Sequence, residues 1–497
     1  MGFATNMEVS ALILKALLVI GLCAITKVFY NIFVHPLRSY PGPWLARATI
    51  IESQRHNLNG YSHLWLQSLH EKYGPVVRFA PSMLSYIDPT SWKDIYGHKA
   101  TAFQKAPEFY GKDIFGDPAG IIRADDISHA RQRRLVSHAF SDKSLRDQDK
   151  LLKGYAAILV DQLAKIAGAP DNETNMLSWY NFIAFDVMAD LTFGEDLGQL
   201  RNSTYNDWVG STFYVAKFLA LNGIINAWGL AGVLNLIMPA SLKAKRDHHK
   251  EFVVEKVDRR LAQNTTRPDI WTYVMKKSKD GGETLSTTEM HNNGSTFMGA
   301  GTETVATELS GLTYMLLKNP DKMHRLKSEI RGAFKHLDDM TTTKLSQLEY
   351  LQACIDEGLR LYPPLPTGTQ RVKPVGGAMV CGRWVPSGTL VQTNFYSLQR
   401  SPRNFKNPDT FAPERFLPEG AEEYASDRKD GLNPFSFGPK NCVGKNLAYH
   451  EMRLVLASVL LHFDLELSPE KGNWMDDQQS FILWAKTPLM VKLKLAT

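Results

Sequence analysis

Residues 435–444 read Phe435-Ser436-Phe437-Gly438-Pro439-Lys440-Asn441-Cys442-Val443-Gly444 and place one cysteine in a loop punctuated by glycines. A stretch with helical character, Lys445-Asn446-Leu447-Ala448-Tyr449-His450-Glu451-Met452-Arg453, follows directly. Gly438 and Gly444 allow tight turns and the close approach of a flat ligand. A thiolate at the N-terminal end of a helix is stabilised by unpaired amide groups, and it is a strong electron-donating ligand for heme iron. A buried structural cysteine is the alternative, so the surroundings of Cys442 must decide.

The loop closely resembles the heme-binding signature of the cytochrome P450 superfamily, F-x-x-G-x-R-x-C-x-G. Phe435, Gly438, Cys442 and Gly444 match this signature, whereas Lys440 stands where the family usually has arginine. The substitution keeps the cationic charge but loses the bidentate fork of a guanidinium group.

The resemblance implies a mainly α fold with small β-sheets and a bound heme b. It implies Cys442 as the axial ligand of the heme iron, with Phe435, Gly438 and Lys440 in contact with the heme. The chain is most similar to the membrane-bound members of filamentous fungi that act in secondary metabolism.

The composition is that of an ordinary globular protein with room for a large core and a cofactor. The chain has 497 residues and a net charge of +6, without a run of basic residues interleaved with aromatic ones. We therefore expect no nucleic-acid partner. The four cysteines (Cys23, Cys354, Cys381 and Cys442) form no CxxC pair, which argues against a zinc site or a disulfide framework.

The N-terminal segment is apolar over residues 9–34 and is long enough to cross a bilayer as one helix. Lys15 and Lys27 lie near its ends, where lysine side chains can reach the interface. The only early charge is Glu8, which is not typical of a cleaved signal peptide. Basic residues follow (Lys27, Arg38, Arg47 and Arg55), so the positive-inside rule places the rest of the chain in the cytosol. An interfacial amphipathic helix is the alternative.

Three segments follow from this reading of the chain. Residues 1–34 are the predicted single-pass membrane anchor, and residues 35–43 form a proline-rich hinge that we expect to act as a stiff spacer. Residues 44–497 form the predicted heme-binding catalytic domain. Within it, the uncharged stretch 218–242 is predicted to be a lid that dips into lipid or caps an apolar cavity. The resemblance implies the endoplasmic reticulum membrane, with the catalytic domain facing the cytosol.

A capping box at residues 286–289 predicts a long helix that ends near residue 318. It contains Ala300-Gly301-Thr302-Glu303-Thr304, which resembles the oxygen-activation motif of the family. Ala300 and Gly301 are small enough to admit a flat macrocycle and O2. Thr304 is the predicted proton relay and Glu303 its predicted supply, which is general acid catalysis in a site that excludes water. The alternative is that Thr304 bonds to its own helix and Glu303 is a solvated charge.

Glu357 and Arg360 lie one helical turn apart on one face of a helix. Such pairs are common on exposed helices. The resemblance implies that both join Arg415, in Pro413-Glu414-Arg415-Phe416, as a buried charge triad beneath the heme loop. Removing one member of a buried network leaves an unpaired charge.

Cationic residues are expected around the heme propionates, because charge-assisted hydrogen bonds to carboxylates are strong. The resemblance implies His129, Arg133 and Arg371 for this role, alongside Lys440. Surface charges are the alternative for each of them.

A second group of basic residues suits the docking of an acidic electron donor: Arg131, Arg134, Lys445 and Lys440. No dinucleotide-binding fingerprint is present, so electrons must come from another protein. The resemblance implies NADPH–cytochrome P450 reductase, with cytochrome b5 as a further donor.

The sequence therefore predicts a membrane-anchored heme-thiolate monooxygenase. The expected reaction inserts one atom of O2 into an apolar small molecule, as a hydroxylation or epoxidation in fungal terpenoid or polyketide biosynthesis. One alternative is an enzyme of the same fold that catalyses rearrangement, dehydration or oxidative coupling. The other is a non-enzymatic heme protein that senses or carries a gas.

Overall fold

The structure is a computed structural model. It describes residues 2–98, 103–111, 115–206, 208–209, 221, 223–225, 228, 239–279, 283–373, 375–469, 473–476 and 478–496. The predicted lid at 218–242 therefore lies for the most part outside the described residues.

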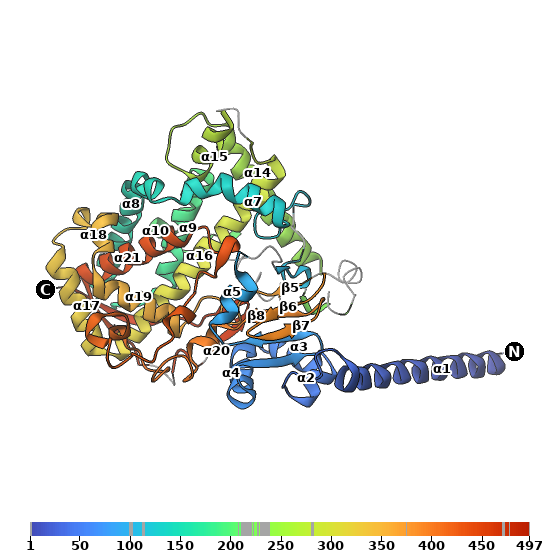
Figure 1. The fold of residues 1–497 in the computed structure, drawn as a ribbon. Coiled ribbons are helices and arrows are strands. Elements are labelled where there is room, and N and C mark those ends of the chain that lie inside the picture. The colour runs from blue at the N-terminus through green and yellow to red at the C-terminus, as the bar shows by residue number, and fades with distance from the viewer. Residues whose placement is uncertain are drawn as a thin grey trace.

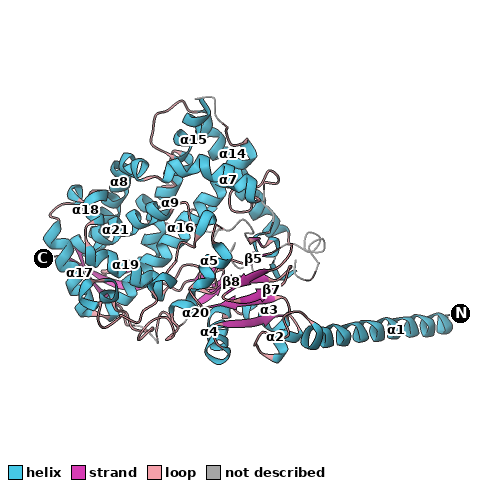
Figure 2. Cartoon of the chain, viewed as in Figure 1, coloured by secondary structure: helices cyan, strands magenta, loops and turns pink. Residues whose placement is uncertain are grey.

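Helices make up most of the molecule, as Figure 2 shows. The longer ones are α1 (Gly2–Phe29), α4 (Ser62–Tyr73), α7 (Asp126–Val136), α8 (Asp142–Ala167), α9 (Met176–Phe193), α14 (Ala240–Ala262), α15 (Ile270–Lys279), α16 (Thr287–Lys318), α17 (Pro320–Ala333), α19 (Glu349–Leu361) and α21 (Lys445–His462). The shorter ones are α2 (Trp44–Ala48), α3 (Ile51–Leu58), α5 (Thr90–Tyr96), α6 (Pro107–Tyr110), α10 (Gln199–Asn202), α18 (Thr342–Ser346) and α20 (Phe395–Gln399).

Four small sheets complete the fold, so the predicted mainly α class is confirmed. The largest has the strand order β1 (Val76–Ala80), β2 (Met83–Tyr86), β8 (Leu390–Thr393), β5 (Arg371–Val372) and β3 (Gln104–Lys105). The others are β4 (Glu173–Asn175) with β12 (Met490–Leu495) and β9 (Phe463–Leu467), the hairpin β6 (Ala378–Val380) and β7 (Arg383–Val385), and the hairpin β10 (Gln479–Phe481) and β11 (Leu483–Ala485). Only β2 and β8 pair in parallel among the described strands.

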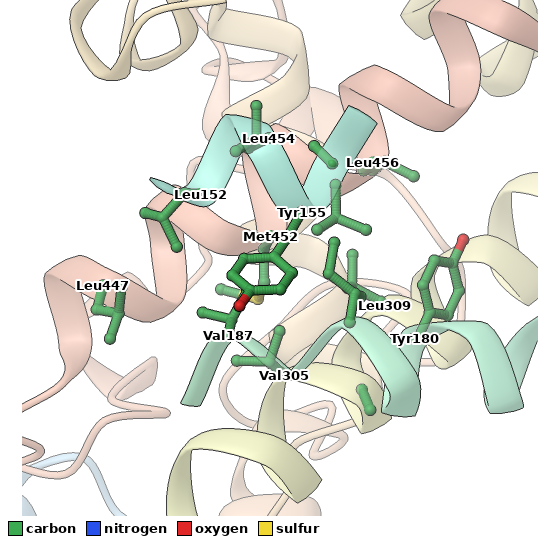
Figure 3. Close-up of a cluster of buried hydrophobic side chains, with 14 of the residues drawn as sticks. Leu152, Tyr155, Tyr180, Val187, Val305, Leu309, Leu447, Met452, Leu454 and Leu456 are labelled. Carbon is green, nitrogen blue, oxygen red and sulfur yellow. The ribbon is translucent and has the colours of Figure 1, made fainter. Parts of the chain in front are cut away.

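The main core lies where α8, α9, α16 and α21 meet (Figure 3). Its buried side chains include Leu152, Tyr155, Val187, Leu309 and Met452. Burial of each large apolar side chain contributes about 1.5–3 kcal/mol. This packing fixes α16 and α21, which carry the two motifs that the sequence singled out.

The signals at the ends of the helices act as expected. The Ser286 hydroxyl accepts from the amide of Glu289, and the Glu289 carboxylate accepts from the amide of Ser286, so the capping box opens α16. Gly194 ends α9 with φ +76°, a left-handed conformation that glycine adopts without strain. Helix α16 therefore begins and ends close to the predicted residues.

The N-terminal helix α1 projects away from the body (Figure 1). Ser10–Val34 has a mean hydropathy of 2.3, and none of its most apolar window is buried against the protein. Within the described part of the chain, it is the only helix long and apolar enough to cross a membrane.

The proline-rich segment at residues 35–43, which the sequence predicts to be a stiff spacer, packs onto the body. Leu37 and Tyr40 are buried among residues of the large sheet. The carbonyl of Pro41 accepts from the amide of Arg78 on β1 at 2.7 Å. A side chain at Gly42 would overlap the Arg78 carbonyl oxygen, so glycine permits this close approach.

Candidate functional site

The loop before α21 holds Cys442 in a fixed position. The amide of Cys442 donates to the carbonyl oxygen of Phe435 at 2.9 Å, and this hydrogen bond closes the loop. Gly438 has φ +74°, and any side chain there would overlap the carbonyl oxygen of Tyr96. Gly444 is the N-cap residue of α21. Only glycine fits at position 438, because both the dihedral angle and the space exclude a Cβ atom.

The Cys442 side chain is accessible to solvent although protein surrounds it on nearly all sides. Desolvation is the largest influence on the pKa of the thiol and raises it, against the Gly444 amide, Arg133 and Lys445, which lower it. The sulfur is therefore open to a ligand, although its surroundings do not favour an unpaired thiolate. The expected stabilisation of the thiolate by the helix end is therefore outweighed by burial, and a bound metal ion would supply the missing charge.

The middle of α16 presents an exposed surface between buried flanks. Gly299 and Ala300 are exposed, although Phe297, Met298 and Thr302 are buried. A Cβ atom at Gly299 would meet nothing within 4 Å. Such a bare, accessible helix face in the protein interior leaves space for a flat ligand.

Phe140 links this face of α16 to the cysteine loop. Its ring lies 5.6 Å from that of Phe297, centroid to centroid. The same ring lies 4.0 Å from the position of a Cβ atom on Gly444. The bare part of α16 and the Cys442 loop therefore border one region of the molecule.

Gly301 has a different role from the one predicted. A Cβ atom at this position would overlap the side chain of Met188 on α9. Gly301 thus faces α9 and permits close packing of the two helices, while Gly299, which the sequence analysis did not single out, faces open space. The motif pattern could not distinguish the two faces of the helix.

The predicted proton-relay residues have specific partners. The Thr304 hydroxyl donates to the carbonyl oxygen of Ala300 at 2.7 Å, so Thr304 does bond to its own helix, as the alternative interpretation expected. Its oxygen keeps its capacity to accept. Glu303 is not a solvated charge, because its Oε2 accepts from Nζ of Lys486 at 2.7 Å.

Cationic and neutral donors gather beside the cysteine loop. Arg133 donates to the carbonyl oxygen and the side chain of Asn441, and so holds the loop itself. His129 is buried, and desolvation first, then Lys105, Lys440 and Arg133, lower its pKa to about 3. His129 is therefore neutral at physiological pH and offers a ring N–H. Lys440 Nζ pairs with Asp126 at 2.6 Å.

Arg371 is 3% exposed and pairs with no carboxylate within the described ranges. Its guanidinium group donates to the Tyr110 hydroxyl and lies 5.1 Å from the centroid of the Tyr96 ring. A buried guanidinium without an anionic partner is costly. An anionic group of a ligand would satisfy it.

The predicted charge triad is in contact and has a fourth member. Arg360 donates to both oxygens of Glu357 at 2.7 and 2.8 Å, and Arg415 Nε lies 3.1 Å from Glu357 Oε2. Arg415 also pairs with Asp427. Arg360 donates further to the carbonyl oxygens of Gln399, Pro408 and Thr410. All four charged side chains are fully buried, so the network fixes the segment that precedes the cysteine loop.

Much of the predicted basic docking surface is neutralised by ion pairs. Arg131 pairs with Glu289 and Arg134 with Glu283. Lys445 lies 6.0 Å from the centroid of the Phe435 ring and remains beside the cysteine loop. The basic character of this face is thus weaker than the sequence suggested.

The residues present fit a heme carrying two carboxylates. A lone thiol lies on one side, a bare helix face belongs to the same region, and buried or half-buried donors that favour an anion lie beside them. Within the described residues, no group of His, Cys, Asp or Glu side chains could hold a bare metal ion.

Comparisons with known proteins agree with this chemistry. A family model described as Cytochrome P450 matches residues 40–493. The chain is 43% identical over 479 residues to the cytochrome P450 monooxygenase efuB of Hormonema carpetanum, covering 95% of this chain and 94% of the relative. It is 44% identical over 467 residues to the cytochrome P450 monooxygenase FUM2 of Gibberella moniliformis, covering 93% and 98%. It is also 39% identical over 481 residues to an averantin hydroxylase of Dothistroma septosporum, covering 95% and 89%.

Proposed function

This chain belongs to the cytochrome P450 family, and on that premise we propose that it is a membrane-anchored monooxygenase that inserts one atom of O2 into an apolar small molecule. The observation that carries the proposal is the Cys442 thiol, which lies accessible but desolvated at the start of α21. When bound, the heme supplies the iron centre and the electron transfer that O2 activation requires.

The protein's own residues hold and orient the cofactor. Cys442 is the axial ligand in this proposal, and Phe435 and Gly438 shape its loop. Arg371, with the Arg133, His129 and Lys440 cluster, would bind the propionates, since both sites present donors suited to an anion. Glu357, Arg360, Arg415 and Asp427 keep the loop's supporting segment in place.

Proton delivery is assigned to α16. The Thr304 hydroxyl lies on the accessible side of the helix, beside the bare surface of Gly299 and Ala300. Glu303 is the adjacent carboxylate that would supply the proton. Positioned proton transfer of this kind typically accelerates a reaction by about 10²–10⁴-fold.

The anchor, the redox partner and the class of substrate follow from the same premise. We assign α1 to the endoplasmic reticulum membrane, with residues 44–497 in the cytosol, and NADPH–cytochrome P450 reductase as the electron donor. Cytochrome b5 is a second candidate donor. The relatives named monooxygenases and averantin hydroxylase come from fungi and support an oxidation in fungal secondary metabolism. The reaction proposed here is a hydroxylation or epoxidation of a terpenoid or polyketide.

The test is the absorption spectrum of the reduced protein under carbon monoxide. A heme with an anionic sulfur ligand gives a strongly red-shifted Soret band, and the Cys442→Ala variant should lose that band. A wild-type protein that binds heme stoichiometrically without this band would refute the assignment of Cys442.

Two measurements separate the alternatives. Oxidation that depends on NADPH in microsomes distinguishes a monooxygenase from an enzyme of the same fold that rearranges or dehydrates its substrate. Oxygen consumption that depends on substrate distinguishes it from a gas sensor or carrier. The Glu303–Thr304 pair favours the monooxygenase over rearrangement, dehydration and gas carriage, because those three activities need no supply of protons.

A further inference from the structure

Lys486 reaches the proton-supply residue from the far end of the chain. It follows β11 directly, and its side chain is only 4% exposed. Its Nζ donates to Oε2 of Glu303 at 2.7 Å and to the hydroxyl oxygen of Thr307 at 2.9 Å. The Thr307 hydroxyl in turn donates to the carbonyl oxygen of Glu303 at 2.6 Å. The ammonium group thus bonds to two successive turns of α16.

The hairpin that carries Lys486 is itself held firmly. Trp484 Nε1 donates to the carbonyl oxygen of Pro363 at 2.8 Å, and the indole stacks on Tyr362 at 4.6 Å between ring centroids. The hairpin also packs against α16. Because its backbone is fixed on both sides, the lysine places its ammonium group at a defined point.

The ion pair decides where the Glu303 carboxylate points. The other oxygen, Oε1, is buried and has no hydrogen-bond partner among the described residues. Tyr205 is a titratable neighbour that Glu303 influences electrostatically. Removal of a close cation from a buried ion pair leaves the other member without its partner, which is costly. Lys486 therefore controls the orientation of Glu303.

We propose that Lys486 is a positioning residue of the proton relay, holding the Glu303 carboxyl group oriented beside Thr304. This inference rests on the proposed function. Insertion of oxygen consumes O2, two electrons and two protons, and it yields one oxidised product and one water molecule. If protons arrive late, the same two electrons and two protons leave with O2 as hydrogen peroxide. A misplaced Glu303 should therefore increase the share of electrons released as peroxide.

The experiment uses the full-length holoprotein reconstituted with purified NADPH–cytochrome P450 reductase, with NADPH and O2 as the only probes. Without an organic substrate, O2 leaves either as hydrogen peroxide, with two electrons and two protons, or as two water molecules, with four electrons and four protons, so a poorer proton supply again favours peroxide. We expect Lys486→Met to raise the peroxide formed per NADPH by about threefold or more, since general acid catalysis contributes larger factors still. Lys486→Arg should restore most of the wild-type ratio, because it keeps the charge. Adding Lys486→Met to Glu303→Gln should change the ratio little further.

Two further measurements make the result independent of turnover. The reduced carbon monoxide spectrum should be identical in all variants, which shows that heme binding is intact. In thermal unfolding, the double variant should lose less stability than the two single variants together, because both remove one ion pair. Lys494→Met, at an exposed lysine on β12, is the matched control and should change neither quantity.

An unchanged peroxide ratio in Lys486→Met would overturn the proposal, whether or not Glu303→Gln raises it. If Lys486→Met does not retain heme, Lys486→Gln and Lys486→Arg decide, and equal ratios in both would refute a role for the charge. Failure of the proposed function has a different signature, because the wild-type protein would then lack the red-shifted Soret band.

Discussion

Glu451 on α21 should make the protein less stable as the pH rises. Its side chain is 2% exposed, and its Oε1 has no hydrogen-bond partner among the described residues. Desolvation raises the pKa of this carboxyl from 4.5 to about 8. The folded state therefore holds a proton that the unfolded state releases, so the stabilisation is complete below pH 4.5 and is lost as the pH rises through 8.

The size of the effect follows from the shift of the pKa. Each pH unit between these two values changes the free energy of unfolding by about 1.4 kcal/mol. Between pH 6 and pH 8 the loss is roughly 2–3 kcal/mol. The unfolding entropy of a globular protein is about 2.1 cal/mol/K per residue, so this loss lowers the melting temperature of a chain of this length by roughly 2–3 °C.

The assay compares wild-type protein with Glu451→Gln by thermal unfolding of the holoprotein at several pH values from 6 to 8.5. The glutamine does not titrate. The melting temperature of Glu451→Gln minus that of the wild type should therefore increase by about 2 °C as the pH rises. Glu422→Gln, at an exposed carboxylate, is the control and should show no such trend. A difference between wild type and Glu451→Gln that stays constant across this range would refute the buried, protonated carboxyl.

Four further outcomes follow from the structure. Asp427→Asn should remove one of the two carboxylate partners of the buried Arg415 and destabilise the protein by about 3 kcal/mol, which purification would reveal as a lower heme-to-protein ratio. Gly438→Ala should disrupt the cysteine loop and abolish the red-shifted band, whereas Gly388→Ala, with a similar positive φ but open space around it, should cost only about 1–2 kcal/mol and keep the band. Arg371→Met should speed the transfer of heme to apomyoglobin, because it removes a buried cation that has no carboxylate partner in the described ranges. Deletion of residues 2–29 should move the protein from the membrane fraction to the soluble fraction, and retention in the membrane would show a second site of attachment.

The sequence predicted those features that depend on neighbours in the chain. The capping box and the pattern after it located α16 because hydrogen bonds within one turn fix a helix end. The spacing of Glu357 and Arg360 placed both on one face of α19, and their contact is direct. The cysteine loop was recognisable because its glycines and its cysteine lie close together in the chain and belong to the same loop.

Features that depend on tertiary packing escaped the sequence. Lys486 lies 183 residues from Glu303, and an ordinary lysine after a strand carries no sign of burial. Asp427 stands in a polar stretch that looks like an exposed loop, yet it pairs with Arg415 in the interior. The wrong role for Gly301 has the same origin, because only the position of α9 shows which side of α16 is covered.

The attachment of residues 31–42 to the body has a consequence for the proposed membrane anchor. The Arg78 guanidinium donates to the carbonyl oxygens of Asn31 and Pro81, and Asn31 donates to the carbonyl oxygen of Ala48. These bonds join the last turn of the anchor to the catalytic body as a rigid elbow. If α1 crosses the membrane as proposed, the body is held at one angle to the bilayer, and a compound dissolved in the lipid would approach one side of the enzyme.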